Sequence, residues 1–203
     1  MQRLGIFGGT FDPIHHAHLA IGEEARVRLA LDQVLFVPAA HQPLKTNHGA
    51  SAQNRLAMVW SATATNPAFA VSDIEIRRKG VSYTIDTINA LRQQHPNSEL
   101  WFIIGADSIH TLPRWHKIDQ LIPLMQFAVF ERPQSSNDFN AVFQALPTLA
   151  SRMTRFVGPR IDLSASELRE RIAQHLPIRY LVPDTVAKYI EEKKLYQNKE
   201  QRA

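Results

Sequence analysis

The chain has 203 residues, of which 23 are Lys or Arg, 19 are Asp or Glu and none is Cys. This length suits one domain, and the lack of cysteine excludes disulfides, zinc–thiolate sites, iron–sulfur clusters and thiol nucleophiles. The net charge is only +4, with no long basic run of the kind that favours nucleic-acid binding. Because neither a membrane-spanning apolar run nor a signal peptide is evident, we expect a cytoplasmic protein.

Short apolar runs alternate along the chain with longer amphipathic stretches. The apolar runs predict strands at Leu4–Phe7, Val34–Val37, Phe69–Ile76, Leu100–Ile104, Phe127–Phe130 and Arg155–Val157. The amphipathic stretches predict helices at Ala17–Leu29, Ala52–Thr65, Ile85–Gln94, Asp138–Ala145, Glu167–Gln174 and Thr185–Lys194.

This alternation predicts the α/β class: a Rossmann-like, doubly wound parallel sheet with helices on both faces. We expect one domain over residues 1–203, with a small helical C-terminal portion from about residue 164. Open sheets of this kind bind ligands beyond the C-terminal ends of their strands, where the strand order reverses. The segments that follow strands are therefore the places to look for chemistry.

The turn after the first strand contains Gly8, Gly9, Thr10 and Phe11 and leads into the first helix. Adjacent glycines permit positive φ and a close approach of the backbone to a ligand. A helix N-terminus adds free N–H groups and partial positive charge, so the turn is a candidate phosphate site. It is neither a Walker A loop nor a G-x-G-x-x-G fingerprint, which disfavours a P-loop kinase and a simple dehydrogenase.

His15 and His18 stand three positions apart at the start of that helix and share one face of its first turn. Two imidazoles there could donate hydrogen bonds to phosphate oxygens in a transition state. The spacing also fits a packed histidine beside a surface one, or a metal pair. A zinc site needs further ligands, and no convincing third ligand lies nearby. The position beside the glycine turn favours the phosphate interpretation.

A second candidate anion site lies near the C-terminus. Ser164 and Glu167 form a capping-box pattern that marks a helix start, and capping alone could explain both residues. Capping does not explain Arg169, whose planar and permanently charged guanidinium suits phosphate groups. Together with the Ser166 hydroxyl, these groups predict a site for the outer phosphates of a nucleotide.

Two middle segments complete the set of candidates. Thr84 opens a predicted helix whose N–H groups could hold a carboxylate, although a plain Ser/Thr cap explains it equally well. Gly105 and Asp107 follow a predicted strand at the expected binding edge. Trp115 lies in a proline-containing loop, where its indole could stack on a flat heterocycle or pack against the core.

Two of these motifs resemble signatures of the nucleotidyltransferase superfamily whose hallmark is the histidine pair H-x-G-H. The segment from Gly8 to His18 resembles G-G-T-F-D-P-x-H-x-G-H, except that Ala17 replaces the glycine. The segment from Ser164 to Arg169 resembles S-[ST]-T-x-x-R, from which Ala165 and Ser166 depart. Two such motifs in the expected order are more specific than either alone.

From Leu4 to about Tyr196 the chain is similar to the bacterial nicotinate-mononucleotide adenylyltransferases. The resemblance implies condensation of nicotinate mononucleotide with ATP to deamido-NAD and pyrophosphate, by direct attack with no covalent intermediate. It implies ATP as co-substrate and Mg²⁺ that arrives with ATP, with no dedicated metal site. We expect neither a nucleic-acid nor a membrane partner; protein partners are not predicted.

The resemblance also implies roles for individual residues. Those implied in catalysis are His15, His18 and Arg169. Those implied in ATP binding are Gly8, Gly9, Thr10, Phe11, His15, His18, Gly105, Asp107, Arg132, Ser164, Ser166 and Arg169. Those implied in binding the mononucleotide are Lys45, Arg55, Thr84 and Trp115.

Two alternatives remain open from the sequence. A superfamily member that adenylates pantetheine phosphate, or one that transfers CMP, would share the first turn but not the pocket around Thr84 and Trp115. A non-catalytic nucleotide-binding module would keep the fold without turnover. The sequence assigns no role to His41, His48, His110 or His116.

Overall fold

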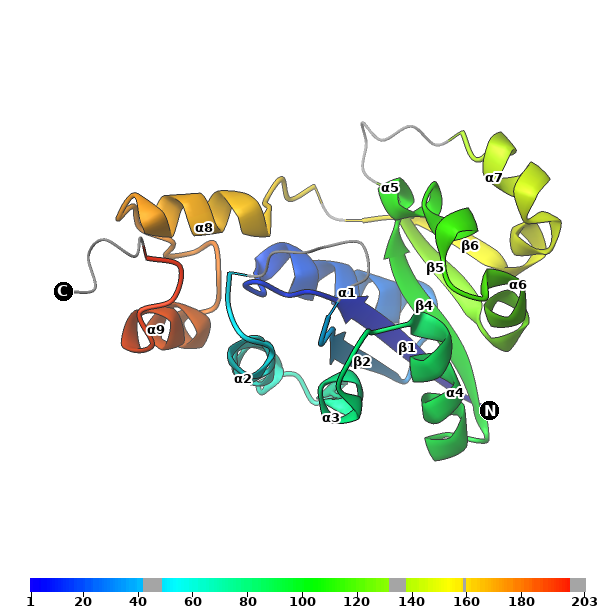
Figure 1. Ribbon diagram of the computed structural model, residues 1–203, viewed down its shortest axis with the longest axis horizontal. Helices are drawn as coiled ribbons and strands as arrows, with labels where there is room; N and C mark the ends of the chain where they lie inside the picture. Colours follow the sequence, from blue (N-terminus) through cyan, green and yellow to red (C-terminus); the bar gives the residue numbers. More distant parts are fainter. Residues whose placement is uncertain (42–48, 132–137, 159, 198–203) are drawn as a thin grey trace.

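The structure, a computed structural model, describes residues 1–41, 49–131, 138–158 and 160–197. Its centre is a six-stranded parallel sheet in the order β3-β2-β1-β4-β5-β6 (Figure 1). The strands are β1 (Gln2–Gly9), β2 (Gln33–Pro38), β3 (Phe69–Val71), β4 (Ser98–Gly105), β5 (Gln126–Glu131) and β6 (Met153–Val157). The strand order reverses between β1 and β4, so the predicted doubly wound parallel sheet is confirmed.

Helices follow the strands in sequence and cover the sheet. The longer ones are α1 (His16–Arg28), α2 (Ala52–Thr63), α4 (Thr84–Gln94), α8 (Ala165–Ala173) and α9 (Asp184–Glu192). The shorter ones are α3 (Ile74–Arg78), α5 (Ala106–Ile109), α6 (Ile118–Leu121), α7 (Asn140–Ala145) and the 3₁₀ turns η1 (Leu112–Arg114), η2 (Ile122–Leu124) and η3 (Pro147–Arg152). Figure 1 shows α8 and α9 gathered at one end of the molecule, opposite α6 and α7.

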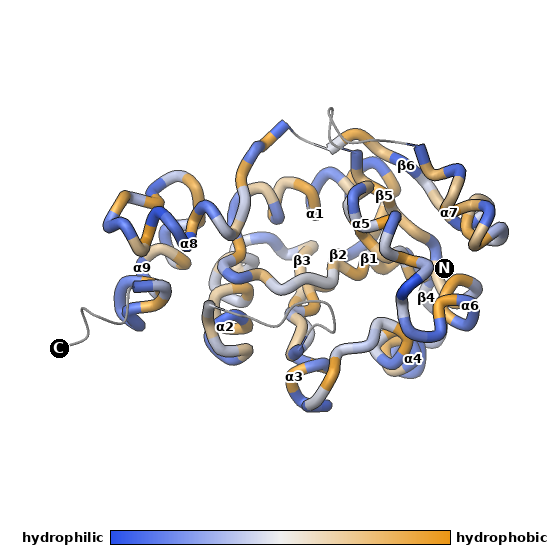
Figure 2. Tube along the Cα trace, turned by 45° about the horizontal axis from the view of Figure 1, so that its top comes forward, coloured by the Kyte–Doolittle hydropathy of each residue, from blue (hydrophilic) through white to orange (hydrophobic). Residues whose placement is uncertain are grey.

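The alternation of side chains along each strand builds two apolar cores, one on each face of the sheet. On β4, Phe102 and Ile104 point into one core, whereas Trp101 and Ile103 point into the other. The first core is covered by α4, α5, α6 and α7, and the second by α1, α2, α8 and α9. In Figure 2 the helices carry hydrophobic and hydrophilic colours in alternation, as expected of helices with one buried side.

One predicted element is wrong in part. The expected strand Phe69–Ile76 ends at Val71, and Ile74–Arg78 forms the short helix α3. The Ser72 hydroxyl accepts a hydrogen bond from the Ile74 N–H at 3.3 Å and turns the chain out of the sheet. An apolar run by itself does not separate a strand from a buried helical turn, which is why the sequence pattern failed here.

Some of the residues singled out from the sequence lie in segments that the structure does not describe. Lys45, His48 and Arg132 lie outside the described residues. Within the described part of the chain, no helix is both long and apolar enough to cross a membrane.

Candidate active site

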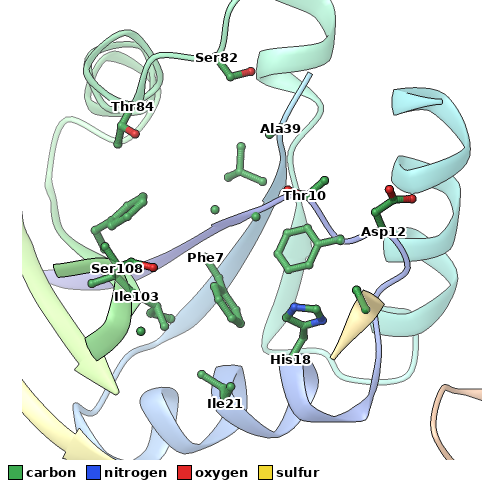
Figure 3. Close-up of a pocket in the computed structure, with 18 of the residues that line it drawn as sticks. Phe7, Thr10, Asp12, His18, Ile21, Ala39, Ser82, Thr84, Ile103 and Ser108 are labelled. Atoms are coloured by element: carbon green, nitrogen blue, oxygen red, sulfur yellow. The ribbon is translucent and has the colours of Figure 1, made fainter. Parts of the chain in front are cut away.

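A cavity of about 1050 Å³ opens at the C-terminal ends of β1 and β4. Its walls come from the turn after β1, the start of α4, the segment 105–116 after β4 and the start of α8. In Figure 3, His18 lies at one end of the pocket, with Ser82 and Thr84 at the opposite end. The cavity therefore lies at the sheet edge where the reversal of strand order predicts a ligand site.

Most of the residues that the sequence singled out line this one cavity. They come from segments far apart in the chain, and they are Gly8, Gly9, Thr10, Phe11, His15, His18, Thr84, Gly105, Asp107, Trp115, Ser164, Ser166 and Arg169. Arg55 does not line it.

The glycine turn is built differently from the expectation. Of the described glycines only Gly80 has a positive φ, so Gly8 and Gly9 do not use the freedom expected of them. In the turn Phe11, with φ of 51°, adopts the left-handed conformation. A Cβ on Gly9 would lie only 2.9 Å from the Phe11 ring. Position 9 therefore requires glycine, because the ring of Phe11 fills the space that a side chain would need.

The two histidines stack against each other at the start of α1. Their ring centroids are 3.7 Å apart with an interplanar angle of 25°, and His15 is only 4% exposed. The backbone N–H of His15 donates to Nδ1 of His18 at 3.3 Å. A ring nitrogen that accepts a hydrogen bond carries no proton, so neutral His18 holds its proton on Nε2. The edge of Phe11, at 5.1 Å between centroids, further orients the His18 ring.

The second candidate anion site lies at the start of α8. The backbone N–H of Glu167 donates to Oγ of Ser164 at 3.2 Å, and the backbone N–H of Ser164 donates to the Glu167 carboxylate at 3.0 Å. The predicted capping box is therefore present, and the Ser164 hydroxyl and N–H lower the pKa of Glu167. One turn further, Arg169 donates from Nη2 to the Ser166 hydroxyl at 3.1 Å and from Nη1 to the Asp12 carbonyl at 2.8 Å.

The bond to Asp12 joins the two motifs that the sequence placed at opposite ends of the chain. Because His18 and Arg169 line the same cavity, a ligand that fills it meets both an imidazole and a guanidinium.

The other half of the cavity is aromatic. The indole N–H of Trp115 donates to the Thr111 hydroxyl at 3.1 Å, and its ring meets Phe102 edge-on at 5.8 Å. Tyr83 and His116, which sequence reasoning left without a role, lie with ring centroids 4.4 Å apart and line the same wall. Such surfaces suit a flat heterocycle, and the bond to Thr111 fixes the orientation of the indole.

Among the longer helices, α1, α4 and α8 have N-termini that line the cavity, and the start of the short helix α5 lines it as well. Each carries the partial positive charge of a helix N-terminus, and the charge of Arg169 adds to it at α8. The arrangement favours a ligand with several separated anionic groups over a neutral one.

Arg55 has a different position from the one expected of a substrate-binding residue. Its side chain is 0% exposed and donates to the backbone carbonyls of Thr10 at 2.6 Å, Ala39 at 2.7 Å, Ala40 at 3.2 Å and Ala50 at 3.4 Å. Burial lowers the pKa of Arg55, and the nearby Asp12 opposes that shift. Arg55 therefore ties the turn after β1 to the end of β2 and the start of α2.

Asp12 and Glu75 line the cavity without having been assigned a role from the sequence. Asp12 lies inside the quoted glycine motif, so its position was a usable signal. Glu75 accepts a hydrogen bond from the Thr87 hydroxyl at 2.7 Å, and nothing in its sequence context indicated this. Among the described residues, no cluster of three or more His, Asp or Glu side chains could hold a metal ion.

Known proteins are similar to this chain in both sequence and fold. A family model described as cytidylyltransferase-like matches residues 6–171. A relative from Herpetosiphon aurantiacus, named probable nicotinate-nucleotide adenylyltransferase, is 58% identical over 97% of this chain and 99% of its own length. The nicotinate-nucleotide adenylyltransferase of Bacillus subtilis is 40% identical over 98% of this chain and 100% of its own length.

Among solved structures, the nicotinic acid mononucleotide adenylyltransferase of Plasmodium falciparum complexed with NaAD matches with a TM-score of 0.77. It covers 97% of this chain and 98% of its own, at 19% identity, so this likeness concerns the fold.

The position of Arg55 leads to a stability prediction. Arg55→Met removes the guanidinium that donates to the carbonyls of Thr10, Ala39, Ala40 and Ala50, and we expect it to lower the free energy of unfolding by about 3 kcal/mol or more. Arg92→Met is the matched control, because Arg92 donates to a single carbonyl, that of Leu124, at the surface. Urea unfolding followed by circular dichroism measures both, and equal losses for the two variants would contradict the structural role of Arg55.

Proposed function

The chain belongs to the nicotinate-nucleotide adenylyltransferases, within the cytidylyltransferase-like nucleotidyltransferases, and we propose that the cavity is the place where nicotinate mononucleotide and ATP are joined to form deamido-NAD and pyrophosphate. The observation that carries the proposal is that the histidine turn, Arg169 and the aromatic wall around Trp115 line one cavity. The histidine turn and Arg169 suit the phosphates of a nucleoside triphosphate, and the aromatic wall suits a pyridine ring.

The reaction needs only the groups that the two substrates carry. An oxygen of the mononucleotide 5′-phosphate attacks the α-phosphorus of ATP, and the bond from that phosphorus to the bridging oxygen of the β-phosphate breaks. Pyrophosphate leaves from the side opposite the attack. Because the attacking phosphate is already a nucleophile, the protein contributes position and charge neutralisation.

In this proposal the two anion sites bind different phosphates of ATP. His15 and His18 lie at the α-phosphate, where charge develops, and Nε2–H of His18 donates to an equatorial oxygen. Arg169, Ser164, Ser166 and the N-terminus of α8 hold the β- and γ-phosphates that leave as pyrophosphate. The turn from Gly8 to Phe11 and the Gly105–Asp107 segment contact the rest of ATP.

The aromatic half takes the pyridine mononucleotide. The N–H groups at the start of α4, beside Thr84, receive the nicotinate carboxylate, and Trp115 stacks on or beside the ring. Lys45 and Arg132 keep their proposed contacts with the mononucleotide and with ATP. Arg55 acts indirectly, because it holds the turn that carries Thr10.

We propose that Mg²⁺ enters bound to ATP, whose phosphate oxygens suit it, and that it offsets charge on the triphosphate there. Of the described side chains at the nucleotide end, the carboxylate of Asp107 lines the cavity and is of the ligand type that Mg²⁺ accepts. We place the reaction in the cytoplasm, because both substrates are charged nucleotides of that compartment.

The decisive test of the reaction is an acceptor panel. Purified protein is incubated with ATP and Mg²⁺ and with nicotinate mononucleotide, nicotinamide mononucleotide or pantetheine phosphate, and pyrophosphate release is measured. We expect nicotinate mononucleotide to give a kcat/KM at least about tenfold above the nicotinamide form, because a helix N-terminus favours a carboxylate over a neutral amide. Turnover with pantetheine phosphate alone would contradict the proposal.

The position of His18 predicts a loss of rate. His18→Ala removes one positioned donor to the transition state, and we expect kcat to fall on the order of 10²–10³-fold while both KM values change little. His16→Ala is the control, because His16 is exposed and does not line the cavity. Steady-state kinetics with both substrates measures the effect, and an unchanged kcat in His18→Ala would show that the histidine is structural.

The start of α4 allows the backbone N–H to be tested separately from the side chain. Thr84→Pro removes the N–H at the first helical position, where proline is tolerated, and Tyr83 already has the extended conformation that precedes proline. Thr84→Ala keeps that N–H and removes the hydroxyl. We expect the KM for nicotinate mononucleotide to rise more in the proline variant, with the KM for ATP unchanged. Equal KM values for nicotinate mononucleotide in the two variants would rule out the backbone contact.

A further inference from the structure

The carboxylate of Asp12 is a meeting point of three chain segments. It accepts hydrogen bonds from the backbone N–H groups of Gly49 at 2.7 Å and Ala50 at 3.0 Å, and from the hydroxyl of Tyr196 at 2.7 Å. Asp12 is only 4% exposed. A buried carboxylate requires such donors, and three of them fix its position.

The same residue is in direct contact with the nucleotide end of the cavity. The backbone carbonyl of Asp12 accepts the hydrogen bond from Nη1 of Arg169 at 2.8 Å. The side chain of Asp12 therefore receives Tyr196, while its main chain receives Arg169. A displacement of Asp12 would be passed to Arg169 directly.

Packing joins Tyr196 and Arg169 a second time, at Gly49. A Cβ built on Gly49 would lie 2.8 Å from Cδ of Arg169 and 2.8 Å from Cδ1 and Cε1 of Tyr196. The Arg169 stem and the Tyr196 ring thus both reach the space beside this glycine. Any side chain at position 49 would have to displace one of them.

We propose that Tyr196 is a positioning residue, which acts through Asp12 and Gly49 to hold Arg169 in its orientation at the cavity. Tyr196 does not itself line the cavity, so it acts only through these neighbours. The inference rests on the proposed function in one respect, namely that Arg169 binds the β- and γ-phosphates of ATP. It assigns a role in the active site to the segment that follows α9, at the far end of the chain from the glycine turn.

The environment of Tyr196 suits a permanent donor. Burial raises the pKa of its phenol, and the Asp12 carboxylate raises it further, so the hydroxyl keeps its proton at any pH at which the enzyme would work.

The test compares two tyrosines that are close in sequence. Tyr196→Phe removes the bond to Asp12 and keeps the ring. Tyr189→Phe is the matched control, because its hydroxyl donates to Oδ1 of Asn54 at 3.0 Å and Tyr189 does not line the cavity. We expect Tyr196→Phe to raise the KM for ATP about tenfold, the size of one hydrogen bond to a charged group, with the KM for nicotinate mononucleotide unchanged. We expect Tyr189→Phe to change neither KM.

A double-mutant cycle separates positioning from a general loss of structure. In an Arg169→Ala background the guanidinium is absent, so Tyr196→Phe should cause no further rise in the KM for ATP. Gly49→Ala tests the packing contact independently and should also raise the KM for ATP. If the effects of Tyr196→Phe and Arg169→Ala simply multiply, or if Tyr196→Phe matches the wild type, the proposal is overturned.

Direct ATP binding keeps this result distinct from the proposed function. Isothermal titration of the wild type and of Tyr196→Phe with ATP and Mg²⁺ needs no turnover. If the wild type binds ATP but turns over no acceptor, the proposed reaction fails, and an approximately tenfold weaker affinity in Tyr196→Phe still supports the positioning role. Equal affinities in the two proteins would overturn the positioning role, whatever the activity.

Discussion

The site depends on the accumulation of positive potential where the sheet reverses its strand order. β1 and β4 are neighbours, but the chain leaves them in different directions, which opens a crevice at their C-terminal ends. Parallel strands direct the helices that follow them toward that same edge. The N-termini of α1, α4 and α8 consequently line one cavity, to which each helix adds a partial positive charge.

Buried charge holds that crevice in shape. Arg55 lies behind the turn after β1 and donates to four backbone carbonyls. Asp12 lies within that turn and accepts from two backbone N–H groups and Tyr196. Each charge is costly to bury, but each has several hydrogen-bond partners, so a shift of the surrounding loops would break some of these bonds. A rigid turn is what a reaction that depends on position requires.

The two halves of the cavity differ in chemistry for a physical reason. In the proposed reaction one end of the cavity holds the negative charges of ATP, and helix starts, imidazoles and Arg169 line that end. The other end is proposed to hold a flat ring with one charged group, and aromatic side chains and the start of α4 line it.

Local patterns in the sequence were sufficient to predict most of the strands and the main helices, and to single out the two motifs that line the cavity. The apolar run Leu100–Ile104 and the capping box at Ser164 each consist of residues that are close together in the chain. The sequence therefore shows both features directly. The pattern failed at Ile74–Arg78, where a serine side chain ends the strand and a buried helical turn follows.

The family and its reaction were also readable, because the histidine and arginine motifs are compact. What only the tertiary structure decided is which partners meet across long stretches of the chain. Arg55 looked like a ligand-binding cation, but its environment makes it a buried tie between loops. Tyr196 and Gly49 carried no signal, since their importance comes from contact with Asp12 and Arg169, and such contacts exist only after the chain has folded.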